Sequence, residues 1–168
     1  MSGRLPWPSG FSVVEDPDVS DTPRFAELLG YWQSKRGERQ MPRRSDIDPP
    51  LELARHADSL VLIEVVAEAD DFRYRLIGTQ VVARHGRDST GMTARQLYEN
   101  ADPVVFDWTM TTLRTVVDRR GPVRATNRLQ IVQRDFVTTD QLLLPLADDA
   151  DATVKMILCE VLFHPALN

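Results

Sequence analysis

The segment at residues 31–49 constrains the fold more than any other part of the chain, and it reads YWQSKRGERQMPRRSDIDP. A stretch with helical character and two aromatic side chains runs into five basic residues, and an Asp-x-Asp-Pro turn follows. Clustered charge and proline are costly to bury, so the segment must hold a fixed local shape or a fixed contact. The basic residues are Lys35, Arg36, Arg39, Arg43 and Arg44.

Two interpretations of these arginines remain open. In the first, Arg39, Arg43 and Arg44 pair with nearby carboxylates and fix how the preceding helix returns to the rest of the fold. In the second, they form a positive surface for a partner protein or an anionic signal molecule. Tyr31 favours a second surface, because adjacent helix positions point about 100° apart and Tyr31 and Trp32 cannot both face one core.

Composition narrows the function classes. The chain has 168 residues, enough for one domain with a sizeable core. Its net charge of −5 does not favour nucleic-acid binding, since no general positive field would attract phosphates. Cys159 is the only cysteine, which suits a reducing compartment, and no apolar run is long enough for a membrane span or a secretion signal. We therefore expect one cytoplasmic domain.

The N-terminal part divides into an arm and a helix. Residues 1–20 are proline-rich and aperiodic, which indicates a flexible or surface-draped arm, with Trp7 and Phe11 as candidate anchors. The domain itself is predicted over residues 21–168. Its first helix follows Thr22 as cap, and Gly37 is suited to end it. Asp48 is expected to cap a short second helix.

Hydrophobic patterns then predict five strands. Leu60–Val66 is apolar except for Glu64, which needs a partner such as Arg73 or Arg75 if it is buried. The next run alternates apolar and basic residues, as a strand with one wet face does. Short helices and one long helix separate this pair from the last three strands, so we expect an α+β fold. The predicted elements after the first strand are the strand at 72–76, helices at 80–85, 93–98 and 103–120, and strands at 123–132, 136–146 and 153–163.

Six short motifs occur in a fixed order along residues 25–165. They are Tyr31-Trp32, Arg36-Gly37-x-Arg39, Pro42-x-Arg44-x-Asp46-x-Asp48-Pro49, Phe72-Arg73-Tyr74-Arg75-Leu76-Ile77-Gly78-Thr79, Gly86-Arg87-Asp88 with Thr90-Gly91, and Leu144-Pro145-Leu146. In this order they resemble the PAS-domain superfamily, and most of all a stand-alone alphaproteobacterial PAS-like family. The resemblance implies a five-stranded antiparallel sheet in the order 2-1-5-4-3, with helices on one face plus the N-terminal helix.

The cofactors of other PAS domains were compared with these residues. Covalent flavin chemistry needs an Asn-Cys motif on a middle helix, whereas Cys159 lies in the predicted last strand, where burial of a small thiol explains it. Haem needs an axial ligand, usually a histidine on the long helix, and none occurs there; His85 lies nearby, beside a glycine. No spacing of histidine, cysteine and carboxylate suggests a metal site. We predict no cofactor and no metal.

The resemblance implies a sensory or adaptor role in bacterial signalling through another signalling protein, and we expect a homodimer formed through the N-terminal helix and the exposed sheet face. An interior left partly open would be an apolar pocket for a small ligand, and a filled one would be a core. The alternative is a small α+β enzyme or carrier with a cone-like or hot-dog sheet, for which only Glu64 or His85 offers a catalytic group. The candidate lining residues are Leu62, Phe72, Tyr74, Leu76, Trp108, Leu113, Leu129, Leu142 and Leu158.

Overall fold

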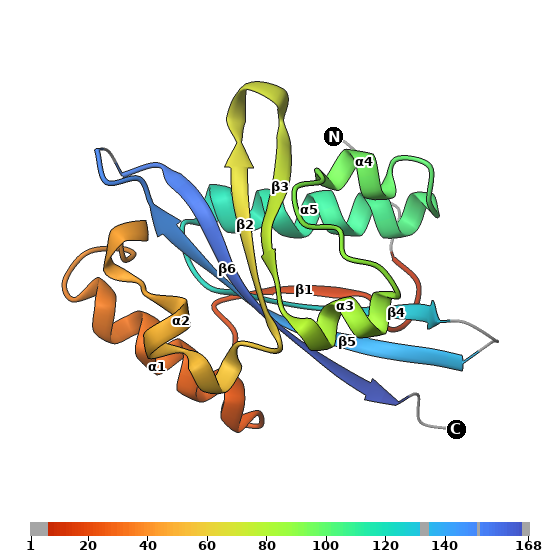
Figure 1. The fold of residues 1–168 in the computed structure, drawn as a ribbon, viewed down its shortest axis with the longest axis horizontal. Coiled ribbons are helices and arrows are strands. Elements are labelled where there is room, and N and C mark those ends of the chain that lie inside the picture. The colour runs from red at the N-terminus through yellow and green to blue at the C-terminus, as the bar shows by residue number, and fades with distance from the viewer. Residues whose placement is uncertain (1–6, 132–134, 151, 166–168) are drawn as a thin grey trace.

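The computed structural model describes residues 7–131, 135–150 and 152–165. It contains one six-stranded antiparallel sheet in the order β1-β4-β5-β6-β2-β3, with helices packed against it (Figure 1). The elements are β1 (Ser12–Glu15), α1 (Pro23–Arg36), η1 (Arg44–Asp46), α2 (Pro49–Glu52), η2 (Ala54–His56), β2 (Leu60–Val66), η3 (Ala67–Ala69), β3 (Asp71–Ile77), α3 (Thr79–His85), α4 (Ala94–Tyr98), α5 (Pro103–Arg119), β4 (Val123–Ile131), β5 (Asp135–Ala147) and β6 (Val154–Pro165).

The predicted strand order is confirmed, and a sixth strand is added to it. Taken alone, the five predicted strands lie in the order β3-β2-β6-β5-β4, which is 2-1-5-4-3 in their own numbering. The sixth strand, β1, pairs with β4 and comes from the arm that we expected to be flexible or draped over the surface. That expectation is wrong for residues 12–15, because β4 offers an unpaired edge whose backbone groups this segment bonds.

Both proposed anchors of the arm are in contact with α5. The Trp7 indole donates a hydrogen bond to Asp107, with 2.8 Å between Nε1 and Oδ2. The rings of Phe11 and Trp108 meet edge to face at 6.2 Å, and Trp108 Nε1 donates to the Ser12 carbonyl. Aromatic packing and the two hydrogen bonds donated by indole groups therefore hold the arm against α5, although its sequence has no hydrophobic periodicity.

Helices cover both faces of the sheet. On β5 and β6, odd-numbered side chains such as Gln141 and Cys159 face α5, and even-numbered ones such as Leu142 and Glu160 face α1. In Figure 1, α1 and α2 lie together on one side, apart from α4 and α5. The sheet face that we expected to be exposed is thus covered by the N-terminal helix, which explains why β5 is buried from Leu142 to Ala147.

The ends of α1 and α5 depart from the expected caps. Thr22 precedes α1 but makes no capping bond, because its hydroxyl bonds Asp21 and accepts from Arg124. Gly37 follows α1 at a φ of 57°, as predicted for a helix stop. After α5 the left-handed residue is Arg120, at a φ of 53°, rather than Gly121.

The arginine-rich segment has a defined local structure after α1. Arg39 Nη2 donates to Asp46 Oδ2 at 2.7 Å and to the Lys35 carbonyl at 3.0 Å. The same Asp46 oxygen accepts from the Arg43 backbone at 2.9 Å, and Arg44 donates to the Ile47 carbonyl. Of the carboxylate pairs that the first interpretation requires, the structure contains the one between Arg39 and Asp46, whereas Arg43 contributes only its backbone amide and Arg44 bonds a carbonyl. Partner binding by the same arginines stays a prediction.

Gly78 marks a close approach between two backbone segments. Its amide donates to the Leu60 carbonyl at 2.7 Å, and the next segment's Gln80 amide donates to the Asp58 carbonyl at 2.9 Å. A Cβ at Gly78 would lie 2.4 Å from the Asp58 oxygen, well inside contact distance. The start of α3 is therefore fixed against the segment that leads into β2.

We expect Gly78→Ala to destabilise the protein by about 1–3 kcal/mol, because the new methyl group meets backbone rather than a movable side chain. Gly30→Ala is the matched control. Gly30 is exposed inside α1 with open space around it, so alanine there should stabilise the helix by about 0.5–1 kcal/mol. Chemical denaturation of both variants measures the difference, and equal effects would contradict the close approach at Gly78.

Candidate functional site

A cavity of about 410 Å³ lies between the sheet and the helices α3 and α5. Its volume is within the range typical of small-molecule sites. A smaller hollow of about 180 Å³ adjoins it and shares Tyr74, His85 and Tyr98 with it. The larger cavity is lined by Val61, Ile63, Tyr74, Val81, Ala83, Arg84, His85, Gly86, Tyr98, Val105, Trp108, Thr109, Thr112, Leu113, Asn127, Thr139, Gln141, Cys159 and Val161.

The floor of the cavity has a polar end and an apolar end. Strand register aligns Asn127 with Thr139, and the neighbouring row contains Gln141. Two rows further along the strands, Ile63 and Tyr74 stand opposite each other and form the more apolar end. A molecule in the cavity would therefore meet amide and hydroxyl groups at one end, and aliphatic side chains with the Tyr74 phenol at the other.

Several polar groups of the cavity are only partly used. The Thr112 hydroxyl is buried and has no hydrogen-bond partner among the described residues, and Thr112 as a whole is 2% exposed. The Thr139 hydroxyl donates to the Asn127 carbonyl oxygen. Gln141 Oε1 meets the Cys159 thiol at 3.8 Å, a weak contact. A buried hydroxyl without a partner costs free energy, so Thr112 needs another explanation than stability.

Burial keeps the titratable groups of the cavity uncharged. It raises the pKa of Tyr74 and Tyr98, so both phenols stay protonated. It also raises the pKa of the Cys159 thiol, which makes this cysteine a poor nucleophile at neutral pH. For His85, burial lowers the pKa, so the neutral imidazole prevails at pH 7. Arg84 is then the charged group of the lining.

The structure places three of the residues predicted to line a pocket, Tyr74, Trp108 and Leu113, along this cavity. The prediction differs from the structure for other residues. It is wrong for three leucines, which are buried on the opposite face, and for Phe72, which is buried but does not line the cavity. The reason is that helices cover both faces, so an apolar side chain on a central strand can belong to either. The three leucines are Leu62, Leu142 and Leu158.

Leu76 and Leu129 complete the predicted lining set. A bulge in β3 places Leu62 opposite Leu76 but Ile63 opposite Tyr74. The extra residue reverses the alternation, so Leu76 leaves the Tyr74 face and is 38% exposed. The side chain of Leu129 lies outside the described residues, so its prediction stays untested.

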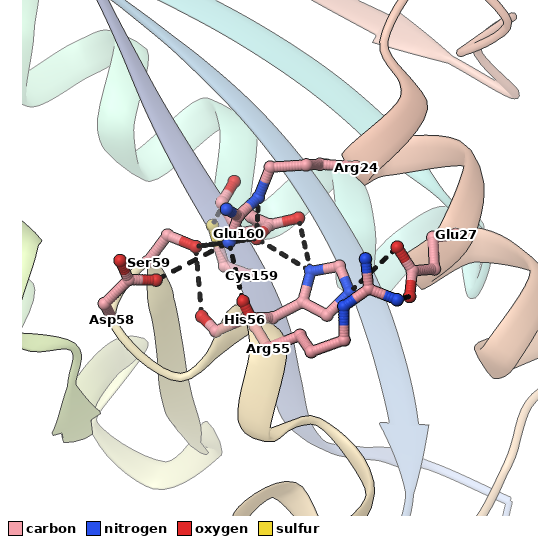
Figure 2. A network of polar contacts seen from close by, with 8 residues as sticks. All are labelled: Arg24, Glu27, Arg55, His56, Asp58, Ser59, Cys159 and Glu160. Carbon is pink, nitrogen blue, oxygen red and sulfur yellow. Dashed lines mark hydrogen bonds and ion pairs between the residues drawn. The ribbon is translucent and has the colours of Figure 1, made fainter.

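A buried polar network lies directly behind the cavity floor, on the α1 face (Figure 2). The Glu160 side chain has no exposed surface and accepts hydrogen bonds from Arg24, His56 and Ser59. The distances to Oε2 are 3.1 Å from Arg24 Nη2, 2.9 Å from His56 Nδ1 and 2.6 Å from Ser59 Oγ. We call these four residues the Glu160 network. It joins α1, η2 and β6 through one carboxylate.

The outer side of the network reaches the surface. His56 Nε2 lies 3.8 Å from Glu27 on α1, and Arg55 pairs with the same carboxylate at 3.2 Å. The Glu160 network therefore contacts α1 at two residues, Arg24 and Glu27. Because a buried carboxylate is stable only when it is fully bonded, α1 cannot move away from β6 without breaking this arrangement.

Sequence analysis missed the Glu160 network although a signal for it was present. Glu160 interrupts an apolar strand in the same way as Glu64, whose predicted partners are confirmed: Arg75 lies at 2.6 Å and Arg73 at 3.8 Å. The same reasoning applied to Glu160 predicts a basic partner. It does not say which one, since Arg24 is 136 positions away in sequence.

Among the described residues, no group of three or more His, Cys, Asp or Glu side chains could hold a metal ion. Likewise, none of the described helices combines the length and apolar character needed to cross a bilayer. The cavity with its polar end is the feature that remains.

We expect Arg24→Met to lower the free energy of unfolding by about 1–3 kcal/mol, because the buried Glu160 carboxylate loses one of its partners while Arg24 itself is 42% exposed. Arg55→Met is the control, since its ion pair with Glu27 is exposed and should contribute under about 0.5 kcal/mol. Denaturant titration of the two variants is the measurement. An Arg24 effect as small as that of Arg55 would mean that the carboxylate does not depend on α1.

Comparison with known proteins agrees with this architecture. A solved structure of an RNA-binding light-oxygen-voltage receptor has the same fold, with a TM-score of 0.53 and 18% sequence identity. The alignment covers 94% of this chain and 39% of the receptor, so the chain spans well under half of that protein. No curated protein matches the chain. The family described as PAS domain matches residues 21–159, and the chain therefore belongs to the PAS-domain family.

Proposed function

We propose that this PAS domain is a sensory module that binds a small molecule in the cavity under α5 and reports its presence to another signalling protein. The observation that carries the proposal is the cavity of about 410 Å³ with the unpartnered Thr112 hydroxyl on its wall. A packed core would have filled this volume with side chains. A site for a ligand would instead keep both the space and a spare polar group.

The competing enzyme or carrier interpretation has less support. Of the two residues considered for a catalytic pair, His85 lines the cavity, whereas Glu64 pairs with Arg75 outside it. The lining contains no carboxylate at all. The other titratable groups of the lining are the Tyr74 and Tyr98 phenols and the Cys159 thiol, whose pKa values burial raises. At neutral pH the imidazole is therefore the group of the lining suited to act as a general base. Binding without chemistry is the simpler use of such a site.

The same strand that floors the cavity also carries the Glu160 network. Cys159 faces the cavity and Glu160 faces α1, so a shift of β6 reaches both faces at once. A second connection runs from the start of α3 at Gly78 to the Asp58 carbonyl, one residue before Ser59. We propose that occupancy of the cavity is passed to α1 along these two connections.

The output would then be a contact made by α1 and the segment after it. Arg43 is exposed there, and Leu51 on α2 is 80% exposed. Tyr31 is half-buried beside α2, where burial and then the nearby Glu52 raise its pKa to about 12, so it offers only part of its ring. A second signalling protein or a second copy of this chain remains our proposal for the partner.

Thr112→Val is the direct test of the cavity as a ligand site. Valine keeps the shape but removes the unpartnered hydroxyl, so the ligand-free protein should become more stable, by about 1 kcal/mol. If the hydroxyl serves a ligand, the variant should at the same time retain less of the small molecule that native mass spectrometry detects on freshly purified wild type. We therefore expect Thr112→Val to be more stable than wild type and to bind less of the small molecule.

Thr115→Val provides the matched control. Thr115 lies on α5 outside the lining, and its hydroxyl already donates to the Thr111 carbonyl at 2.7 Å. Its replacement should leave binding unchanged. The proposal would be contradicted if wild type retained no small molecule and no compound of a metabolite library raised its melting temperature.

A further inference from the structure

Two basic residues stand at the polar end of the cavity. Arg84 and His85 belong to the last turn of α3 and line the cavity. The guanidinium carbon of Arg84 lies 5.7 Å from the centroid of the Phe163 ring, and the His85 ring lies 6.2 Å from it. Phe163 stands opposite Thr139 in the β5–β6 register. Both basic groups are thereby placed at the end of the floor that carries the amide and hydroxyl groups.

Arg84 is charged but has no carboxylate partner. It packs on an aromatic face, and no ion pair to it occurs among the residues that the structure describes. Arg24, Arg39 and Arg114, by contrast, each lie within 4.0 Å of a carboxylate. Other exposed arginines such as Arg43 and Arg87 also lack such a pair within the described ranges, but Arg84 is the one among the residues that line the larger cavity. The chain as a whole is acidic, with a net charge of −5, yet no Asp or Glu lines the cavity.

The polar groups of the floor continue this arrangement inwards. Asn127 and Thr139 are almost fully buried, and Gln141 lies in the next row. Beyond them the lining turns apolar at Val61, Ile63 and Leu113, with two protonated phenols. Since Arg84 is exposed whereas Asn127 and Thr139 are buried, the cavity offers a cation at the surface, then hydrogen-bonding groups, then mainly apolar walls.

Resting on the proposed ligand-binding function, we infer that the ligand is an amphipathic anion whose carboxylate or phosphate head is held at Arg84 and whose apolar or aromatic body fills the cavity. The guanidinium supplies the charge and a planar set of donors suited to an oxyanion. His85 is neutral at pH 7 and adds one hydrogen bond without charge. The amides of Asn127 and Gln141 bond the polar edge of the body.

The chemistry of the head can be tested with matched probes that share one body. 2-Naphthoate, 2-naphthyl phosphate and the neutral 2-naphthamide form one set. Indole-3-acetate with indole-3-acetamide, and decanoate with decanamide, supply two other body shapes. Isothermal titration calorimetry with wild type gives the dissociation constant of each probe. Melting curves of every variant confirm that it is folded.

An anion should bind at least about ten-fold tighter than its amide, since a charge-assisted bond to arginine contributes more than a neutral one. Arg84→Gln should remove this preference while the amides still bind. Arg55→Gln is the control, because it removes the same charge from an exposed arginine on the opposite face of the sheet. There the preference should persist.

Three results would overturn the inference, and they separate it from the proposed function. Amides that bind as tightly as the anions, or a preference that survives Arg84→Gln, would refute the anionic head while leaving a ligand site in place. A preference lost equally in Arg55→Gln would assign it to overall charge rather than to Arg84. If no probe of any body shape binds and wild type retains no molecule, the proposed function and this inference both fall.

Discussion

One buried carboxylate determines how the N-terminal helix is joined to the sheet. Glu160 sits in β6 between β5 and β2, without exposed surface, and is stable there only because Arg24, His56 and Ser59 all bond it. Two of these residues come from α1 and η2, so the N-terminal helix becomes part of the domain. A hydrophobic contact alone would tolerate sliding, whereas this bonded arrangement has one geometry.

On the other face of the same strand, the cavity contains polar groups that lack partners among the described residues. There the protein leaves space, keeps the Thr112 hydroxyl without a partner and leaves Arg84 without a carboxylate in the described part of the chain. Each of these features lowers or fails to raise stability. Functional sites are where such local inconsistencies are expected. The contrast between the fully bonded Glu160 network and the incompletely bonded cavity supports assigning ligand binding to the cavity.

Apolar periodicity and turn residues predicted the five strands and most helix bounds, because they report local structure directly. The order of the strands came from the resemblance to PAS domains. It did not predict β1, whose pairing depends on a distant edge, or the reversal at Leu76, which one inserted residue causes. It also assigned Leu62 and Leu142 to the wrong face, since both faces are buried. The polar floor at Asn127, Thr139 and Gln141 was missed because alternation on a doubly covered strand does not mark the cavity side.

We propose that occupancy of the cavity reaches α1 through Glu160. Hydrogen–deuterium exchange of residues 23–36, with and without saturating 2-naphthoate, tests this coupling most directly in wild type and Glu160→Gln. The ligand should change exchange in α1 of wild type, and the change should disappear in Glu160→Gln, although the cavity residues of α5 still respond. The proposal would be contradicted if the ligand left exchange in α1 of wild type unchanged. It would also be contradicted if the ligand changed exchange in α1 of Glu160→Gln as much as in wild type.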